Sequence, residues 1–241
     1  MAHNTAPVLA PNGTLDVFNP QTGAGFGPGN IVQIYGSGLA NQTGSPSVLP
    51  LPQTINGTSV LIGGIEAPLY YVSATQINAQ IPFELQAGNQ YQVIVSANGA
   101  LTTPQPIQLT TAVPAILQFT SGAVVAQHPD GTLVSETSPA APGEDVVIYL
   151  TGLGATDIAV PSGTASPSGP LANVLDTPIL TLNGTPVPTL FAGLTPALVG
   201  LYQINFQIPQ TFTSGDYQLL ITQSGTASNQ TILSVQQPAQ Q

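Results

Sequence analysis

An internal repeat constrains the fold of this 241-residue chain more than any other feature of its sequence. The most specific match pairs Gln76–Pro82 with Gln203–Pro209, two versions of the motif Gln-Ile-Asn-x-Gln-Ile-Pro. The order of the motifs is the same in both halves. The other matches are Pro11–Leu15 with Pro129–Leu133, Pro28–Gly29 with Pro142–Gly143, Ile34–Leu39 with Ile148–Leu153, and Gly64 and Pro68 with Gly184 and Pro188.

The repeat predicts two domains of similar build. One copy covers residues 5–114 and the other covers residues 115–236. We therefore expect one domain at residues 1–114 and a second at residues 115–241, which ends in a polar tail from Gln236. The spacing between matched motifs varies along the chain, so insertions fall in loops. The longest predicted loop is the proline-rich segment Pro161–Pro170.

Each copy also has the alternation of apolar and polar residues that is typical of half-buried antiparallel strands. In Gln76–Ile81 and Tyr202–Ile208 every second residue is apolar, and the residues between them are glutamine or asparagine. Twenty-five glycines and 24 prolines separate short apolar runs, and helical spacing is not sustained anywhere. Hairpin turns are predicted at Asn12-Gly13, Gly63-Gly64, Asp130-Gly131 and Asn183-Gly184.

About seven short strands in each copy fit a sandwich of immunoglobulin size. The expected fold is therefore all-β, with two tandem immunoglobulin-like β-sandwich domains. The motif Pro-Gly-x-x-Val-x-Ile-x-Gly-x-Gly-Leu at Pro28–Leu39 resembles the start of TIG-type immunoglobulin-like domains. With the two Gln-Ile-Asn motifs and Pro139–Ala155, the chain resembles the uncharacterised C-terminal repeat of large secreted Acidobacteria (Solibacter-type) proteins. The resemblance implies a β-sandwich at an extracellular or cell-surface location, and it carries no activity and no functional residues.

The chain contains no lysine, no arginine and no cysteine, and its formal charge is −10. Because neutralising phosphates requires basic side chains, nucleic acid is not expected as a partner, and anionic membranes are disfavoured. The absence of cysteine excludes a disulfide framework and thiolate chemistry. The start, Met1–Thr5, is neither basic nor apolar, so no signal peptide is expected, and no apolar run is long enough for a membrane span.

Catalytic residues are not predicted. The two histidines are His3, near the N-terminus, and His128, which is expected to be an exposed turn residue rather than a catalytic base. Glu144 and Asp145 are the one adjacent acidic pair, but neighbouring residues in a strand point to opposite faces. The chain is therefore predicted not to be an enzyme.

Two binding chemistries remain open. Calcium is a candidate cofactor because loop carboxylates are its preferred ligands, whereas the alternative is solvated surface charge. The carboxylates concerned are Asp130, Glu136, Glu144, Asp145 and Asp157. N-linked glycans are a second candidate, although Asn-Gly-Thr is also good hairpin chemistry. The five sequons begin at Asn12, Asn41, Asn56, Asn183 and Asn229.

Without lysine, the chain lacks the side chain that most often shields exposed sheet edges. Edges paired by neighbouring subunits would explain this absence, so the predicted function is a non-enzymatic extracellular structural protein. It would form a homo-oligomer or polymer, as the subunit of a self-assembling cell-surface filament or layer. The alternative is a cell-surface adhesin or glycan-binding spacer. Of the pair Tyr70-Tyr71, one side chain is expected in the core and the other at the surface.

Overall fold

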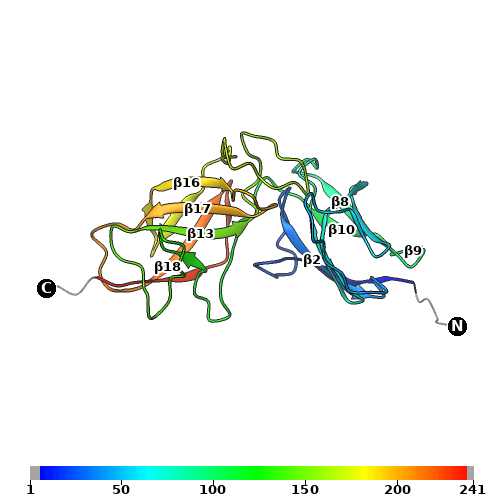
Figure 1. Ribbon diagram of the computed structural model, residues 1–241, viewed down its shortest axis with the longest axis horizontal. Coiled ribbons are helices and arrows are strands. Elements are labelled where there is room, and N and C mark those ends of the chain that lie inside the picture. Colours follow the sequence, from blue (N-terminus) through cyan, green and yellow to red (C-terminus); the bar gives the residue numbers. More distant parts are fainter. Residues whose placement is uncertain (1–5, 238–241) are drawn as a thin grey trace.

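The computed structural model describes residues 6–237, and all regular elements in this range are β-strands. They form two sandwiches that follow one another along the chain (Figure 1). The first sandwich packs a four-stranded sheet, in the order β1-β2-β7-β6, against a six-stranded sheet. The strands of the four-stranded sheet are β1 (Val8–Asp16), β2 (Ile31–Ser37), β6 (Leu69–Val72) and β7 (Gln76–Gln80). Those of the six-stranded sheet are β3 (Thr54–Ile55), β4 (Thr58–Ile62), β5 (Ile65–Glu66), β8 (Gln90–Ala97), β9 (Ala100–Leu101) and β10 (Gln105–Gln108).

The second sandwich consists of two five-stranded sheets with an equivalent topology. Its first sheet has the order β11-β13-β17-β16, with β12 also paired to β13, and its second has β15-β14-β18-β19, with β20 also paired to β18. The first sheet contains β11 (Ala115–Ile116), β12 (Ala126–Gln127), β13 (Asp145–Thr151), β16 (Thr189–Leu194) and β17 (Tyr202–Gln207). The second contains β14 (Ile179–Leu182), β15 (Thr185–Val187), β18 (Gly215–Gln223), β19 (Thr226–Ala227) and β20 (Thr231–Val235).

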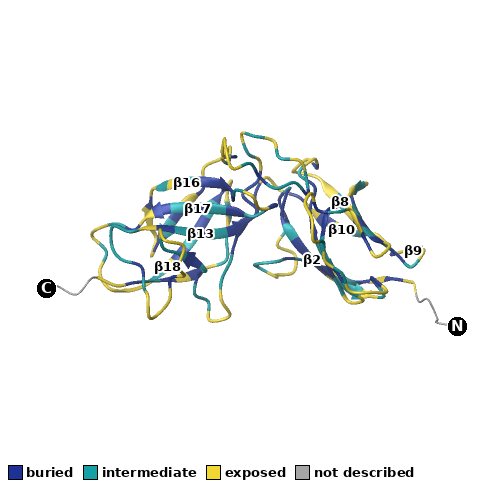
Figure 2. Ribbon diagram, viewed as in Figure 1, coloured by how far each residue is buried: buried dark blue, intermediate teal, exposed yellow. Residues whose placement is uncertain are grey.

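The expected fold of two tandem immunoglobulin-like sandwiches is confirmed. Each sandwich has its own core, to which the apolar positions of the repeated motifs contribute (Figure 2). Ile34 and Ile77 are fully buried in the first core, and Ile148 and Ile204 are fully buried in the second. The alternation in the sequence thus separates a buried face from an outward face. The division at residue 114 stays a prediction.

The predicted turns are mostly confirmed. Gly63-Gly64 and Asn183-Gly184 connect paired strands with positive φ at both residues, and Gly131 has a φ of 84° in a turn. The hairpin predicted at Asn12-Gly13 is wrong. Strand β1 pairs with β2 on both sides of this dipeptide, which therefore forms a bulge. A bulge and a turn both use a residue with positive φ, and Asn12 has a φ of 51°.

Backbone segments and prolines protect the sheet edges in the described chain. Gly44 forms two hydrogen bonds with Val72 of the edge strand β6, and residues 172–174 pair with the edge strand β16. The edge strands β10 and β15 contain Pro106 and Pro186. The other edges are strands of two residues, the bulged β1, and β20, which residues 123 and 140 cover through parallel bridges. Prolines, bulges and covering backbone segments thus protect the sheet edges, a role that lysine has in many other β-proteins.

A buried carboxylate lies where the two sandwiches meet. Oδ2 of Asp16 accepts hydrogen bonds from Nδ2 of Asn30 (2.6 Å) and from Oγ1 of Thr151 in the second sandwich (2.9 Å). Its Oδ1 accepts the backbone N–H groups of Phe18 and Asn19. Burial raises the pKa of Asp16. The four hydrogen bonds act in the opposite direction, but the effect of burial is larger. Neutral donors therefore take the place of a basic partner at this position.

The chain passes closely against itself beside this carboxylate. The backbone N–H of Val113 donates to the carbonyl of Gly152 (2.9 Å). A Cβ at Gly152 would lie 2.0 Å from the carbonyl oxygen of Val113 and 2.9 Å from Oδ1 of Asn30. The close approach therefore requires glycine at residue 152, for its size as well as for its φ of 78°.

A loop of the second sandwich, residues 161–164, forms a further contact with the first and is named here the docking loop. Oγ of Ser162 donates to Glu84 (2.6 Å) and accepts the backbone N–H of Phe83 (2.8 Å). Gly163 donates its N–H to Oε1 of the fully buried Gln80 (2.7 Å), and its carbonyl accepts the N–H of Leu51 (2.8 Å). The docking loop lies within the long loop that the sequence predicts.

We expect Gly152→Ala to destabilise the protein more than Gly131→Ala does. Both glycines have a left-handed φ, so both variants lose about 1–2 kcal/mol from backbone strain. Only Gly152 has backbone atoms in the way, because a Cβ at Gly131 meets nothing within 4 Å. Overpacking should cost Gly152→Ala about 1–3 kcal/mol more. Urea unfolding of both variants measures the difference, and equal losses would contradict the tight junction.

Candidate functional site

The two sandwiches present the same arrangement of aromatic and amide side chains on the outward face of one sheet. In the first, this face lies on β2, β6 and β7; in the second, it lies on β13, β16 and β17 (Figure 1). We name the two faces the amide–aromatic faces. Their residues are Tyr35, Gln76, Asn78 and Tyr71 in the first sandwich and Tyr149, Gln203, Asn205 and Phe191 in the second, all of them half-buried.

The strand register places these side chains in equivalent rows. Tyr35 lies opposite Gln76 across β2 and β7, and Asn78 lies opposite Tyr71 across β7 and β6. Nε2 of Gln76 donates to Oδ1 of Asn78 (2.8 Å), and the Tyr35 hydroxyl donates to Oε1 of Gln33 (2.7 Å). The hydrogen bonds thereby fix the two amides next to each other, in the rows that also contain the two tyrosines.

The second sandwich has the same contacts. Tyr149 lies opposite Gln203, and Asn205 lies opposite Phe191. Nε2 of Gln203 donates to Oδ1 of Asn205 (3.0 Å), and the Tyr149 hydroxyl donates to Oε1 of Gln127 (2.5 Å). Burial raises the pKa of the Tyr149 hydroxyl above its ordinary value.

Packing of the core does not require amides on these faces. The inward residues of the same strands, Ile77 and Ile204, are fully buried, whereas the outward positions tolerate many polar side chains. Yet both copies keep the same glutamine–asparagine hydrogen bond next to a tyrosine. Aromatic rings offer flat apolar surface, and the amides offer both donors and acceptors. This combination suits a ligand with alternating apolar faces and hydroxyl groups.

The third amide of the motif has separate roles in the two copies. Gln80 is fully buried and accepts the N–H of Gly163 in the docking loop. Its counterpart, Gln207, is exposed and donates to Oδ1 of Asp145 (3.1 Å). The sequence does not distinguish these two residues, because the motif is the same around both.

The prediction for Tyr70 and Tyr71 is wrong, since both side chains are half-buried. A bulge between Leu69 and Tyr71 interrupts the alternation. The hydroxyl of Tyr70 donates to the carbonyl of Val199 in the second sandwich (2.8 Å), and burial raises its pKa. Tyr70 thus stabilises the contact between the sandwiches, and Tyr71 belongs to the first amide–aromatic face.

His128 is not the exposed turn side chain that the sequence predicts. Its side chain is 12% exposed, and Nδ1 lies 2.5 Å from Oε1 of Glu144. Nε2 lies 3.1 Å from the carbonyl oxygen of Ser138. Burial disfavours protonation, but these hydrogen bonds outweigh it and raise the pKa of His128. Both ring nitrogens therefore face acceptors, an arrangement that suits the charged imidazolium and a structural ion pair.

The acidic side chains proposed for calcium make separate contacts. Glu144 binds His128 and also accepts the N–H of Ala141 (2.7 Å), whereas Asp145 binds Gln207. Asp130 accepts the N–H and hydroxyl of Thr132, and Asp157 accepts two hydrogen bonds from Asn173. Glu136 lies at an exposed turn. Among residues 6–237, no three His, Cys, Asp or Glu side chains are grouped so that they could hold a metal ion.

The five sequons lie in different environments. Asn12, Asn41, Asn56 and Asn183 are exposed, and Asn56 and Asn183 occupy hairpin turns with positive φ. Asn229 is half-buried, and its amide bonds both backbone groups of Ile116: Oδ1 accepts the N–H (2.7 Å) and Nδ2 donates to the carbonyl (3.0 Å). Because a glycan would occupy this Nδ2, the contact favours a structural role for Asn229. Glycosylation of the other four stays a prediction.

Some predictions fall on other parts of the chain. His3 and the start Met1–Thr5 lie outside the described residues, as does the end of the polar tail, residues 238–241. In the part of the chain that the structure describes, none of the elements is a helix with the length and hydropathy of a membrane span.

Comparison with known proteins concerns mainly the first sandwich. The model of the IPT/TIG domain matches residues 14–111. The match covers most of the first sandwich and less than half of the chain. The predicted resemblance to TIG-type domains is thereby confirmed for the first copy, and the resemblance to the Acidobacteria repeat stays a prediction. No curated protein matches the chain.

Two solved structures illustrate a distant similarity. One is the Bacteroides ovatus mixed-linkage glucan utilization locus protein SGBP-B with a mixed-linkage heptasaccharide, at 16% identity and a TM-score of 0.35. This alignment covers 88% of the present chain but 43% of that chain. Another is a tandem of titin Ig domains, at 9% identity and a TM-score of 0.23, which covers 86% of this chain and 87% of that one.

The ion pair of His128 predicts a pH dependence of stability. Because folding raises its pKa, its contribution should be complete below the ordinary value of about 6.5 and disappear as the pH rises through the higher folded value. We expect the difference in unfolding free energy between the natural protein and His128→Gln to shrink as the pH rises above about 6.5. Urea unfolding at stepped pH checks this, and a difference that grows with pH would contradict it.

The amide of Asn229 should be needed for stability. Asn229→Ala leaves the N–H and carbonyl of Ile116 without their partner, at a cost of about 1–3 kcal/mol in the free energy of unfolding. Asn41→Ala removes a sequon from an exposed loop and should change stability by less than about 0.5 kcal/mol. Thermal and urea unfolding of the two variants measure both effects. Equal stability of both variants would show that Asn229 does not fix the first strand of the second sandwich.

Proposed function

We propose that this protein is a non-enzymatic, extracellular binding module that recognises neutral polysaccharide through its two amide–aromatic faces. The observation that carries the proposal is the repetition of one outward arrangement, Tyr35, Gln76 and Asn78 in one copy and Tyr149, Gln203 and Asn205 in the other. Sugar rings have apolar faces that stack on aromatic rings, and their hydroxyl groups pair with amides.

The charge of the chain narrows the class of polysaccharide. With ten acidic residues and no lysine or arginine, the protein has no basic partner to offer uronate, sulfate or phosphate groups. Repulsion also disfavours such polyanions at a formal charge of −10. Neutral hexose or acetylhexosamine polymers fit the faces without these penalties. A cell-surface location follows from the same proposal, because such polymers are found in cell walls and extracellular matrices.

The firm contact between the sandwiches supports a bivalent mode of binding. Asp16, Gln80 and Glu84 each bond to the second sandwich, so the two faces are held at a fixed separation. A polymer long enough to reach both faces would bind the second at high effective concentration. Avidity of this kind would compensate for the absence of tryptophan, since the chain contains none.

The acidic and imidazole groups support a role without catalysis. Glu144 and Asp145 contact different partners, and His128 is held between Glu144 and Ser138. The hydroxyl of Ser138 lies 3.3 Å from Nε2 of His128, but the same Nε2 faces the Ser138 carbonyl oxygen at 3.1 Å. A nitrogen that donates its N–H to this carbonyl does not accept a proton from the hydroxyl, as a general base would. The proposal therefore assigns the chain to binding rather than to turnover.

Self-assembly into a filament or layer stays a prediction. The covered, short and proline-bearing edges of the described chain argue against strand addition as the contact, so any such assembly would use the sheet faces. Sedimentation velocity from micromolar to millimolar concentration tests this possibility, and a monomer throughout the range would exclude a polymer.

The tyrosines should carry most of the affinity for polysaccharide. We expect Tyr35→Ala or Tyr149→Ala to weaken binding to a neutral polysaccharide by about tenfold, the equivalent of about 1.4 kcal/mol. The double variant should bind more weakly than either single variant, because each single variant still binds through its one remaining face. Affinity electrophoresis against β-glucan, xylan, mannan and a soluble chitin derivative identifies the ligand, and isothermal titration measures the variants.

Matched glutamines provide the control. Gln76→Ala and Gln203→Ala change the proposed faces, whereas Gln92→Ala and Gln218→Ala change equivalent positions on the other sheet of each sandwich. Only the first pair should weaken binding. Absence of binding to every neutral polysaccharide, or equal losses from both pairs, would overturn the proposal.

A further inference from the structure

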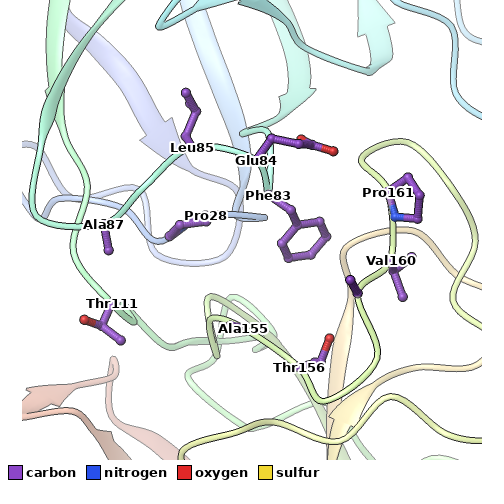
Figure 3. Close-up of a pocket in the computed structure, with 11 residues that line it drawn as sticks. Pro28, Phe83, Glu84, Leu85, Ala87, Thr111, Ala155, Thr156, Val160 and Pro161 are labelled. Atoms are coloured by element: carbon purple, nitrogen blue, oxygen red, sulfur yellow. The ribbon is translucent and has the colours of Figure 1, made fainter.

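The structure has an apolar pocket between the two sandwiches that the amide–aromatic faces do not use. Its volume is about 510 Å³, within the range of about 300–1,000 Å³ typical of small-molecule sites. Both sandwiches provide a wall. The first sandwich contributes Pro28, Phe83, Glu84, Leu85 and Ala87, and the second contributes Ala155, Thr156, Ala159, Val160 and Pro161. Figure 3 shows both walls, with Thr111 of the connecting segment at the rim.

The ring of Phe83 extends into the space between the two walls, toward Thr156 and Val160 (Figure 3). Gly29 makes this position available, because a Cβ there would lie 2.0 Å from a ring carbon of Phe83. The backbone N–H of Phe83 is also fixed by Ser162 of the docking loop (2.8 Å). The ring is therefore preorganised by both sandwiches.

The second copy shows that an aromatic residue is not needed for the local fold. Gln210 follows the same Ile-Pro pair as Phe83, and it packs on Gly143 as Phe83 packs on Gly29. The backbone bonds are also equivalent, since Gly29 donates to Ile81 and Gly143 donates to Ile208. At this position the first copy, whose turn lines the pocket, thus has an apolar ring, and the second copy has an amide.

Glu84 is the one charged residue among those that line the pocket. Its carboxylate accepts two hydrogen bonds from Ser162, at 2.6 and 3.2 Å. Burial opposes ionisation, but these bonds outweigh it and lower the pKa of Glu84, so the group is charged at neutral pH. A negative charge at the wall, in a chain without lysine or arginine, repels anions such as fatty acids.

We propose that this pocket binds a small apolar molecule that carries no negative charge, held between the Phe83 ring and residues Ala155–Pro161. Such a ligand would contact both sandwiches at once. Its binding would therefore also stabilise their contact through the docking loop, as any ligand selective for the assembled state does. The site is separate from the amide–aromatic faces, so neither proposal depends on the other.

The test uses the neutral dye Nile red, whose fluorescence rises in apolar sites, with the full chain. We expect saturable binding at one site, with displacement by decanol and by decyltrimethylammonium but not by decanoate. Displacement by decanoate as strong as by decanol would overturn the charge argument. No saturable binding to the natural protein would overturn the site itself.

Two variants locate the dye. Phe83→Gln copies the residue that the second sandwich tolerates, and Ala159→Trp places a large ring in the pocket from an exposed position. Both should weaken dye binding at least tenfold. Ala159→Trp should keep a melting temperature close to that of the natural protein, whereas Phe83→Gln should lower it, because the ring also packs against the core of the second sandwich. Ala227→Trp, at an exposed position of β19, is the matched control and should bind normally. Normal binding by Ala159→Trp and Phe83→Gln would place the dye elsewhere and overturn the proposal.

Discussion

The contact between the two sandwiches relies on neutral donors that meet carboxylates, in a chain without lysine or arginine. The carboxylate of Asp16 accepts a hydrogen bond from the hydroxyl of Thr151. The carboxylate of Glu84 accepts two hydrogen bonds from Ser162, one from its hydroxyl and one from its backbone N–H. Hydrogen bonds to a charged acceptor are the stronger kind, and they need less desolvation than a buried ion pair. The separation of the amide–aromatic faces and the shape of the apolar pocket both depend on this contact.

The two copies of the repeat have the same backbone hydrogen bond at one position but different side chains that form it. Asn30 and Glu144 occupy equivalent positions, and each accepts the N–H of the residue three positions earlier. The remaining polar atoms then differ, since Asn30 donates to Asp16 and Glu144 pairs with His128. The fold thus fixes the backbone contact, and each copy adapts the outer contact to its surroundings.

The sequence was sufficient to predict the two sandwiches, because period-two alternation and turn residues are local signals. It was also sufficient to place the outward amides of the Gln-Ile-Asn motif. It was not sufficient for residues whose role depends on the other domain. Gln80 and Gln207 share a motif and differ only in what packs against them, while a bulge turns Tyr70 toward Val199. The sequence also did not predict how the sheet edges are protected, because the segments that cover them lack the apolar–polar alternation of a strand.

The path of the chain gives the contact between the sandwiches a mechanical role. The chain enters at the far end of one sandwich and leaves at the far end of the other (Figure 1). A pull between its two ends passes through the connecting backbone, and it also loads the docking loop and the Asp16–Thr151 hydrogen bond beside that connection. Separation of the sandwiches would pull apart the walls that Phe83 and Val160 provide, so tension on the molecule would be expected to release whatever the pocket holds.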